Sequence, residues 1–449
     1  MNKLKTILKR LHYEENIDVK HHEELINDNH VHIIYLSTLT SADMIVKLID
    51  SLSLVVIKDG SINNLATNNL QKVDKIKDIL LSIFEGNALI YFENVDCYLL
   101  GDVKKYPSRS ISSPEVERSV RGSKDGFNES IADNIALIRR RIKDERLMIK
   151  SFVVSSDSKM LVTMMYMNDY CPKEIIDQLS LKIKNVKLQS LIMSESALKE
   201  TIFKQQKLLT PLVRYTERPD VASINLINGK CILLVDTSPN AIICPTSIMD
   251  HLKNVEEYKQ NAAVGTFTKI LRILGSLISI FLVPLFIVMT LKDNYQNEII
   301  EAVNYNASSP ILFQVVAITI FIEIIKIAVV HTPNALISAI SLLAAIILGD
   351  VSTELGIFSP EILLTCSLSA ICNYAIPSYE LSLNCRIVSL FMVIMTCILG
   401  SSGFLISILV VFLYYVSIST LGLPFLYPLC PFDLKIKNIF VRPEKNNKK

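Results

Sequence analysis

The sequence lacks the patterns by which most enzymes and metalloproteins are recognised. Its nine cysteines include no Cys-x-x-Cys pair, and no Ser-His-Asp, Cys-His or paired-carboxylate arrangement stands out. The glycines at 122 and 126 lack the Gly-Lys-Ser/Thr ending of a phosphate-binding loop. Disulfide frameworks and cysteine-ligated metals are therefore not expected. We predict no enzymatic activity and no cofactor.

A strong charge of either sign is also missing. The formal net charge is +2, whereas nucleic-acid-binding proteins are usually more basic, so no nucleic-acid partner is predicted. The N-terminus is basic but has no apolar segment behind its lysines, which argues against a secretory signal.

Histidine is scarce, yet five of the seven residues fall at positions 12, 21, 22, 30 and 32. Clustered imidazoles attract zinc, so a metal site is one interpretation. A solvated, partly helical N-terminal stretch is the other, and we favour it. No metal ligands are predicted.

Charge disappears altogether from long runs beyond Arg272. Ile273 to Leu291 contains 19 residues without a charge, which is close to the length a helix needs to cross a bilayer. Only helices or closed barrels satisfy every backbone group in lipid, and these runs are too continuous for barrel strands. Five apolar segments predict a polytopic helical domain: Lys269–Leu291, Ile311–Val330, Ala335–Gly349, Glu361–Ile376 and Ile387–Leu421. Gly400-Ser-Ser-Gly403 interrupts the last of them, which favours two short spans in a tight hairpin.

The basic residues predict the orientation of these spans. Lys259, Lys269 and Arg272 precede the first span, and the tail 432–449 carries six further basic residues. Loop 292–310 has one lysine, loop 350–360 has no basic residue, and loop 377–386 carries Arg386. By the positive-inside rule, the N-terminal domain and the tail are cytoplasmic, which requires an even number of crossings.

The N-terminal part reads as a mixed α/β domain. Short apolar runs predict strands, and Asn228-Gly229 between the last two of them predicts a hairpin. A stripe of isoleucine and leucine predicts a helix over Lys173–Ile183. The predicted strands are Val31–Leu36, Leu54–Ile57, Ala88–Phe92, Leu161–Met167, Ile224–Ile227 and Cys231–Val235.

The fold prediction is a cytoplasmic N-terminal α/β domain of two lobes followed by a polytopic α-helical transmembrane domain. Its parts are an N-terminal lobe at 1–105, a linker with an amphipathic arginine-rich helix at 106–150, a second lobe at 151–266, about five to six spans at 267–432 and a basic cytoplasmic tail at 433–449.

The arginine-rich helix is predicted from about Asn128 to Lys150, with an apolar stripe that runs from Ile131 to Ile149. Arg139, Arg140 and Arg141 fall in its C-terminal half. Cations there suit the helix dipole, which is one explanation. The other is that they contact neighbouring subunits, acidic partners or anionic lipid headgroups.

Two features stand out inside the spans. Glu323 and Lys326 lie one helical turn apart, so they form an internal ion pair that fixes packing or an element of an ion path. Ser338, Ser341, Ala345 and Gly349 share one face of the third segment. Small residues allow close helix packing, and in a symmetric ring the same face would line a narrow pore.

Four ordered matches, the first of them in two parts, together resemble a known family. Residues 111–130 read Ile-Ser-Ser-Pro-Glu-Val-Glu-Arg-Ser-Val-Arg-Gly-Ser-Lys-Asp-Gly-Phe-Asn-Glu-Ser, and 134–142 read Asn-Ile-Ala-Leu-Ile-Arg-Arg-Arg-Ile. Tyr215–Asp220, Asn228–Pro239 and Ala375–Tyr379 follow in order. This set resembles the A subunits of spore germinant receptors, the GerA family. After Glu323, where the family reads Leu-Arg-Glu-Ala-Gly, this chain has Ile-Ile-Lys-Ile-Ala, so the second acid is lost.

The resemblance implies a nutrient sensor in the inner membrane of a bacterial spore. Such a receptor contains the A subunit, a transporter-like B subunit that binds the nutrient, and a C-subunit lipoprotein. The A subunit would assemble with copies of itself into a ring that forms a ligand-gated ion channel. The pore or gate would use Glu323, Lys326, Ser338, Ser341, Ala345 and Gly349, and the subunit contacts would use Arg121, Arg139, Arg140 and Arg141. A secondary transporter and a non-conducting scaffold remain as alternatives.

Overall fold

The computed structural model describes residues 2–26, 29–52, 56–58, 61–63, 70–105, 123–155, 157–186, 194–203, 209–254, 256, 260–291 and 309–433. Their contacts divide the chain into two units. The first consists of Met1–Lys207, Leu212–Pro245 and Thr420–Gly422, and the second of Leu208–Pro211, Thr246–Ser419 and Leu423–Lys449.

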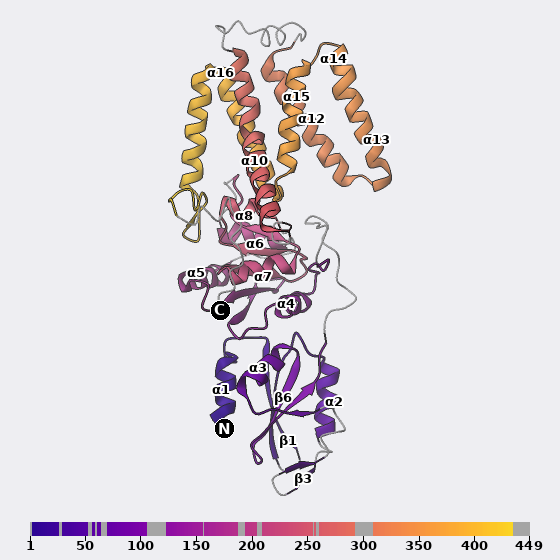
Figure 1. The fold of residues 1–449 in the computed structure, drawn as a ribbon, viewed down its shortest axis with the longest axis vertical. Helices are drawn as coiled ribbons and strands as arrows, with labels where there is room; N and C mark the ends of the chain where they lie inside the picture. The colour runs from indigo at the N-terminus through magenta and orange to yellow at the C-terminus, as the bar shows by residue number, and fades with distance from the viewer. Residues whose placement is uncertain are drawn as a thin grey trace. The chain divides into compact units, whose positions relative to one another are not determined.

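A five-stranded antiparallel sheet forms the N-terminal lobe of the first unit (Figure 1). Its strands in spatial order are β1 Val19–Ile26, β2 Asn29–Leu36, β6 Asn87–Phe92, β7 Cys97–Asp102 and β5 Gln71–Lys72. Two further strands, β3 Val56–Lys58 and β4 Ser61–Asn63, form a separate antiparallel pair. In the sequence they lie between β2 and β5. The predicted strands Val31–Leu36 and Ala88–Phe92 are confirmed.

Helices cover both faces of this sheet because its strands are apolar on both sides. Ile7 of α1 (Asn2–Arg10) and Ile83 of α3 (Ile76–Phe84) pack in one core with Leu89 and Tyr91. On the other face, Leu48 of α2 (Ala42–Leu52) packs in a second core with strand residues that include Ile33 and Ile90. Burying each such side chain contributes about 1.5–3 kcal/mol.

A second five-stranded antiparallel sheet forms the other lobe. Its strands in spatial order are β10 Arg214–Thr216, β12 Ala241–Cys244, β11 Cys231–Val235, β9 Met160–Met167 and β8 Leu147–Val154. The helices of this lobe are α4 Ile131–Arg139, α5 Lys173–Lys184, α6 Ser194–Phe203 and α7 Pro219–Ile227. The α/β class with two lobes is thus as predicted.

The predicted hairpin at Asn228-Gly229 is wrong, because Ile224–Ile227 is the end of helix α7. Gly229 has φ +82°, and its N–H donates to the Leu226 carbonyl at 3.0 Å. The Lys230 N–H donates to the Asn225 carbonyl at 3.1 Å. This pair of bonds is the Schellman motif, in which a left-handed glycine ends a helix.

The long helix predicted over 128–150 is also wrong beyond its first part. Ser130 caps α4 by accepting the Asp133 N–H at 3.4 Å, and the helix ends at Arg139. Asp144 then accepts the Arg146 N–H at 2.9 Å, a local turn that competes with helix. Strand β8 begins at Leu147, so Ile149 belongs to a sheet.

The second unit is helical. Of the helices that the structure describes here, four are long and apolar enough to cross a membrane: Ala263–Thr290, Ile311–Val329, Leu336–Glu354 and Tyr379–Ser417. The elements of the unit are α8 Ile248–Leu252, α10 Ala262–Leu291, α12 Ile311–His331, α13 Asn334–Ala345, the π-helix η4 Ile346–Val351, α14 Ser352–Glu354, α15 Pro360–Tyr374, α16 Tyr379–Ser417 and the short strand β14 Leu423–Pro424. The short strand β13 Ser419–Thr420 straddles the boundary between the two units. Asp350 and Glu354, expected in a loop, continue the third helix.

Gly400 folds α16 back on itself. Its φ of 66° and ψ of −144° are not helical, and a Cβ on Gly403 would collide with the Met395 carbonyl oxygen. Tyr415 Oη donates to Asn384 Oδ1 at 2.5 Å. A straight helix would separate these two residues by about 46 Å. The division expected at Gly400-Ser-Ser-Gly403 is therefore present.

Small residues let α10 and α15 approach closely. Ser369 Oγ donates to the Ser279 carbonyl at 3.0 Å, and a Cβ on Gly275 would lie 3.6 Å from the Cys372 carbonyl oxygen. The span formed by α13, η4 and α14 behaves differently, since only 6% of its most apolar stretch is buried against 33% for that of the first span. Among the described helices, close packing thus uses the small residues of α10 and α15, whereas the small-residue face of α13 lies exposed.

Candidate functional site

An ion cluster joins three helices of the second unit. Arg386 of α16 donates from Nε to Glu323 Oε1 of α12 at 3.2 Å. Lys326 Nζ lies 3.9 Å from the other carboxylate oxygen, so the predicted Glu323–Lys326 pair is present but is the looser of the two. Only 7% of the Arg386 side chain is exposed. Charges inside a span are costly unless paired, and here two cations share the one carboxylate of Glu323.

Aromatic rings complete the surroundings of Lys326. Its Nζ lies 5.5 Å from the ring centroid of Tyr374 in α15 and 4.8 Å from that of Tyr379, the first residue of α16. Such cation–π contacts contribute about 0.5–2 kcal/mol, more where water is excluded. The cluster therefore ties α12, α15 and α16 at one level.

The sequence pattern places Arg386 in loop 377–386 and does not predict its contact with Glu323, whereas the structure places it in a helix. The structure begins α16 at Tyr379, with Ser378 Oγ accepting the Leu381 N–H at 3.5 Å, so Arg386 lies two turns inside the helix. The sequence does carry the signal, because Ser378 followed by Glu380 is typical of a helix start.

The small-residue face on α13 lies open in the single chain. Ser338, Ser341 and Ala345 are exposed and Gly349 is partly exposed. Ser341 Oγ donates to the Ile337 carbonyl at 2.9 Å, which satisfies the hydroxyl within its own helix. A Cβ on Gly349 would meet no atom within 4 Å. The apolar flanks are exposed as well, including Leu342, Leu343, Ile346 and Ile347.

The arginines predicted to contact other subunits do not share one environment. Arg121 lies outside the described residues. Arg139 is fully buried inside the first unit, which is not what a subunit contact requires of a side chain. Arg141 pairs with Asp125 and donates to Ser123 Oγ at 3.0 Å and to the Leu137 carbonyl at 2.7 Å. Arg140, at the end of α4, is the exposed member of the three.

Arg139 reaches instead to Asp18 of the other lobe. Its Nε donates to Asp18 Oδ2 at 3.1 Å, and both side chains are fully buried. Asp18 Oδ1 also accepts the Thr38 N–H at 3.1 Å and the Thr38 hydroxyl at 2.7 Å. Burial lowers the pKa of the Arg139 guanidinium, and the Asp18 carboxylate opposes that shift. One carboxylate thus connects β1, β2 and α4.

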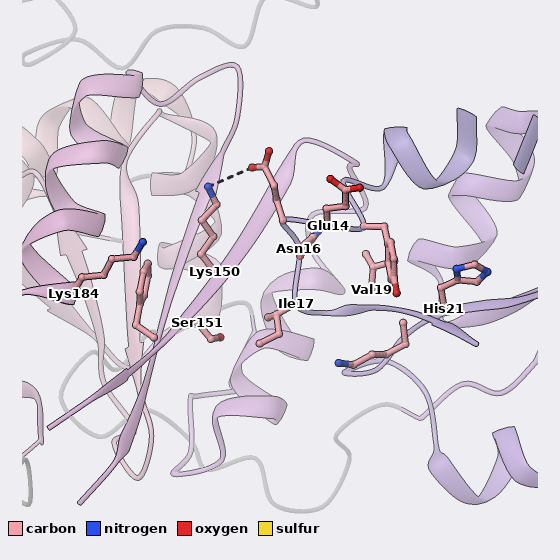
Figure 2. A pocket seen from close by; sticks show the side chains of 12 residues that line it. Glu14, Asn16, Ile17, Val19, His21, Lys150, Ser151 and Lys184 are labelled. Carbon is pink, nitrogen blue, oxygen red and sulfur yellow. Dashed lines mark ion pairs between the residues drawn. The ribbon is translucent and has the colours of Figure 1, made fainter. Parts of the chain in front are cut away.

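A pocket of about 730 Å³ opens where residues 13–21 meet β8 and α5 (Figure 2). The Ile17 N–H donates to the Ile149 carbonyl at 3.3 Å, and Lys150 Nζ lies 3.4 Å from Glu15 Oε2. Burial alone would lower the pKa of Lys150, but Tyr166 and Glu15 raise it. The lining carries both signs of charge, which suits a small polar molecule better than an apolar one.

Comparisons with known proteins agree with the resemblance. The sequence model of the family described as Bacillus/Clostridium GerA spore germination protein matches residues 3–449. The chain is 34% identical to Stage V sporulation protein AF of Bacillus subtilis over 434 residues, which is 94% of this chain and 87% of that protein. It is 28% identical to spore germination protein KA over 90% of this chain and 77% of that one, and 27% identical to spore germination protein A1 over 94% and 89%, both of Bacillus subtilis.

A similar crystal structure is the N-terminal domain of the A subunit of the Bacillus megaterium spore germinant receptor GerK3. It aligns with a TM-score of 0.40 and 24% identity over 54% of this chain and 92% of that one.

Removing one member of the Asp18–Arg139 pair should strongly destabilise the first unit. Arg139→Met leaves a buried carboxylate without its cation, so we expect the free energy of unfolding to fall by about 3–5 kcal/mol. The double variant with Asp18→Asn and Arg139→Met should lose less unfolding free energy than the sum of the losses in the two single variants. Hydrogen–deuterium exchange of β1 and α4 in the detergent-purified chain measures the effect. Arg10→Met, in the exposed pair with Glu145, is the control and should change little. Equal losses in the Arg10 and Arg139 variants would contradict the prediction.

Glu323→Gln should destabilise the second unit more than Lys326→Met. The first change leaves Arg386 buried without a carboxylate at a cost of about 3 kcal/mol, whereas the second keeps the 3.2 Å pair. Thermal unfolding in detergent micelles measures the difference. Glu361→Gln, the same change in the first turn of α15, is the matched control. A Glu323 variant as stable as the Glu361 variant would show that the cluster does not hold the helices.

Proposed function

Because this chain belongs to the GerA family of spore germination proteins, we propose that it is the A subunit of a nutrient germinant receptor that assembles into a ligand-gated ion channel. The observation that carries the proposal is the state of α13 in a single copy. Its apolar flanks suit lipid, while the described part of the chain leaves its serine, alanine and glycine face largely exposed. In a symmetric ring that face would be directed at neighbouring copies and the central axis.

The ion cluster fixes the helices next to α13. Glu323, Lys326 and Arg386 anchor α12 to α15 and α16, and α13 leaves α12 through the turn at Thr332 and Pro333. The α13–α14 segment is held at both ends, by α12 and by α15, and is largely exposed between them, so it has freedom to tilt. We assign gating to a change in the position of α13 through η4, since π-helical turns mark functional irregularities.

Gating would be a population shift driven by a partner. Moving a ring from about 1% to 99% open requires a differential binding energy of about 5.5 kcal/mol. The proposed source is a transporter-like B subunit that binds the nutrient, with a C-subunit lipoprotein as the third component. The proposed location is the inner membrane of the spore. The distribution of basic residues favours an orientation that places the first unit in the cytoplasm.

A second assignment has one observation in its favour. The relative with 34% identity carries a sporulation name, whereas those at 28% and 27% carry germination names. A channel of the same build that works without a nutrient-binding partner would fit that likeness. Conduction by the purified chain alone supports the second assignment, and conduction only in the presence of its partners and a nutrient supports the first.

Bulky substitutions on the α13 face should reduce ion flux. We expect Ser341→Leu and Ala345→Phe to lower single-channel conductance in planar bilayers by at least about twofold, because a narrow pore is sensitive to side-chain volume. Leu343→Phe, on the opposite side of α13, is the matched control and should conduct normally. Currents unchanged by all three substitutions would remove this face from the pore. Substrate counterflow in liposomes without channel currents would indicate a transporter.

Arg140 is the proposed subunit contact on the first unit. Reversing its charge in Arg140→Glu should shift the detergent-purified chain towards smaller assemblies, because like charges repel across an interface. Light scattering coupled to size-exclusion chromatography measures the assembly size. Lys173→Glu, an equal reversal at an exposed position on α5, should leave it unchanged. An Arg140 variant of normal size would show that the subunits meet elsewhere.

A further inference from the structure

The β1–β2 hairpin gathers three metal-ligating side chains on one face. The predicted partly helical N-terminal stretch is here a strand pair, in which Glu23 lies directly opposite His32 and His21 lies opposite Ile34. Cross-strand partners share a face, and residues two apart in a strand do as well. His21, Glu23 and His32 therefore project to the same side.

Their donor atoms form a tight triangle. His21 Nε2 lies 3.1 Å from His32 Nδ1, and Glu23 Oε1 lies 3.4 Å from His32 Nδ1 and 3.8 Å from His21 Nε2. A point exists about 2 Å from all three atoms, which is the length of a Zn–N or Zn–O bond. Among the described residues, these are the histidine, cysteine and acidic side chains close enough to hold an ion.

We propose that His21, Glu23 and His32 bind a divalent transition-metal ion of the zinc class. Two imidazoles and one carboxylate form a known three-ligand zinc set, which leaves a fourth position for water or another ligand. Mg²⁺ and Ca²⁺ prefer shells made of oxygen, so the imidazole pair selects against them. The site is independent of ion conduction, and it lies in the first unit.

Neighbouring aromatic rings hold the two imidazoles in place. Tyr13 meets His21 edge-on at 5.6 Å, and Tyr91 stacks on His32 at 5.8 Å, both between ring centroids. The two histidine side chains are 11% and 12% exposed, whereas that of Glu23 is 65% exposed. Packed imidazoles and an exposed carboxylate allow an ion to enter from the solvent side.

The same atoms have a metal-free arrangement, namely the His21–His32 hydrogen bond, which needs at least one neutral ring. Metal binding needs both rings neutral at the nitrogens that face the ion. The ion would replace a single hydrogen bond with three bonds that join β1, an edge strand, to β2.

Binding should therefore stabilise the N-terminal sheet. An ion held only by the folded hairpin stabilises it in proportion to the logarithm of free metal over the dissociation constant. The sequence signal is two alternating pairs, His21-x-Glu23 and His30-x-His32. It becomes informative only once both segments are known to be strands in this register.

The test is a zinc titration of the full-length chain, purified in detergent with its affinity tag removed and competed against a chromophoric chelator. We expect one high-affinity Zn²⁺ per chain and slower hydrogen–deuterium exchange in β1 and β2 when zinc is bound. His32→Gln should weaken binding by at least about tenfold, as changes around metal ligands do. Co²⁺ in place of Zn²⁺ should give the visible absorption of a four-coordinate site.

His22→Gln is the matched control, because His22 lies on the opposite face of β1 beside Tyr35 and should leave zinc binding unchanged. Glu23→Gln provides a second variant at an exposed position, so a folding defect in His32→Gln would not decide the result. The proposal is overturned if the wild-type chain binds no zinc above background. It is equally overturned if the Glu23, His32 and His22 variants all bind as the wild type does.

Discussion

The buried contact between Asp18 and Arg139 is the constraint on which the first unit depends. It is the point where the end of α4, the start of β1 and the turn after β2 meet. A carboxylate in the interior is tolerable only with a cation and several donors around it. Asp18 has both, so it ties the start of β1 to the end of α4 in the other lobe. The arginine run in 139–141 thus serves the interior first, through Arg139, and the surface second, through Arg140.

The second unit solves a similar problem in a setting with even less water. Glu323 is shared between Arg386 and Lys326, and tyrosine rings cover the lysine. Where the family pattern has a second acid after Glu323, this chain keeps one acid between two cations, so the cluster carries a formal charge of +1. Helices α10, α12, α15 and α16 are held together by this cluster and by close serine contacts. The α13–α14 segment is largely exposed in the described part of the chain.

Short apolar runs were sufficient to predict β2, β6 and β9, and charge-free length was sufficient to predict the membrane helices. The four-residue run Ile224–Ile227 was ambiguous, since a short apolar run fits a strand or a helix, and Pro219 at the first helical turn was the deciding signal. The Glu323–Lys326 pair follows from helical spacing. Arg386 opposite it does not, because the partner comes from 63 positions away. His21, Glu23 and His32 likewise depend on a strand register that residues alone do not reveal.

The short helices of the second unit have a consequence for the membrane around them. Helix α15 has 15 residues and is about 22 Å long, and the arm of α16 after Gly400 is about 25 Å long, against a hydrocarbon core of about 30 Å. A bilayer next to such helices thins to cover them, at a cost for every ångström of mismatch. Acyl-chain length thereby enters the energetics of the protein, and the lipid composition becomes an effector of its conformation.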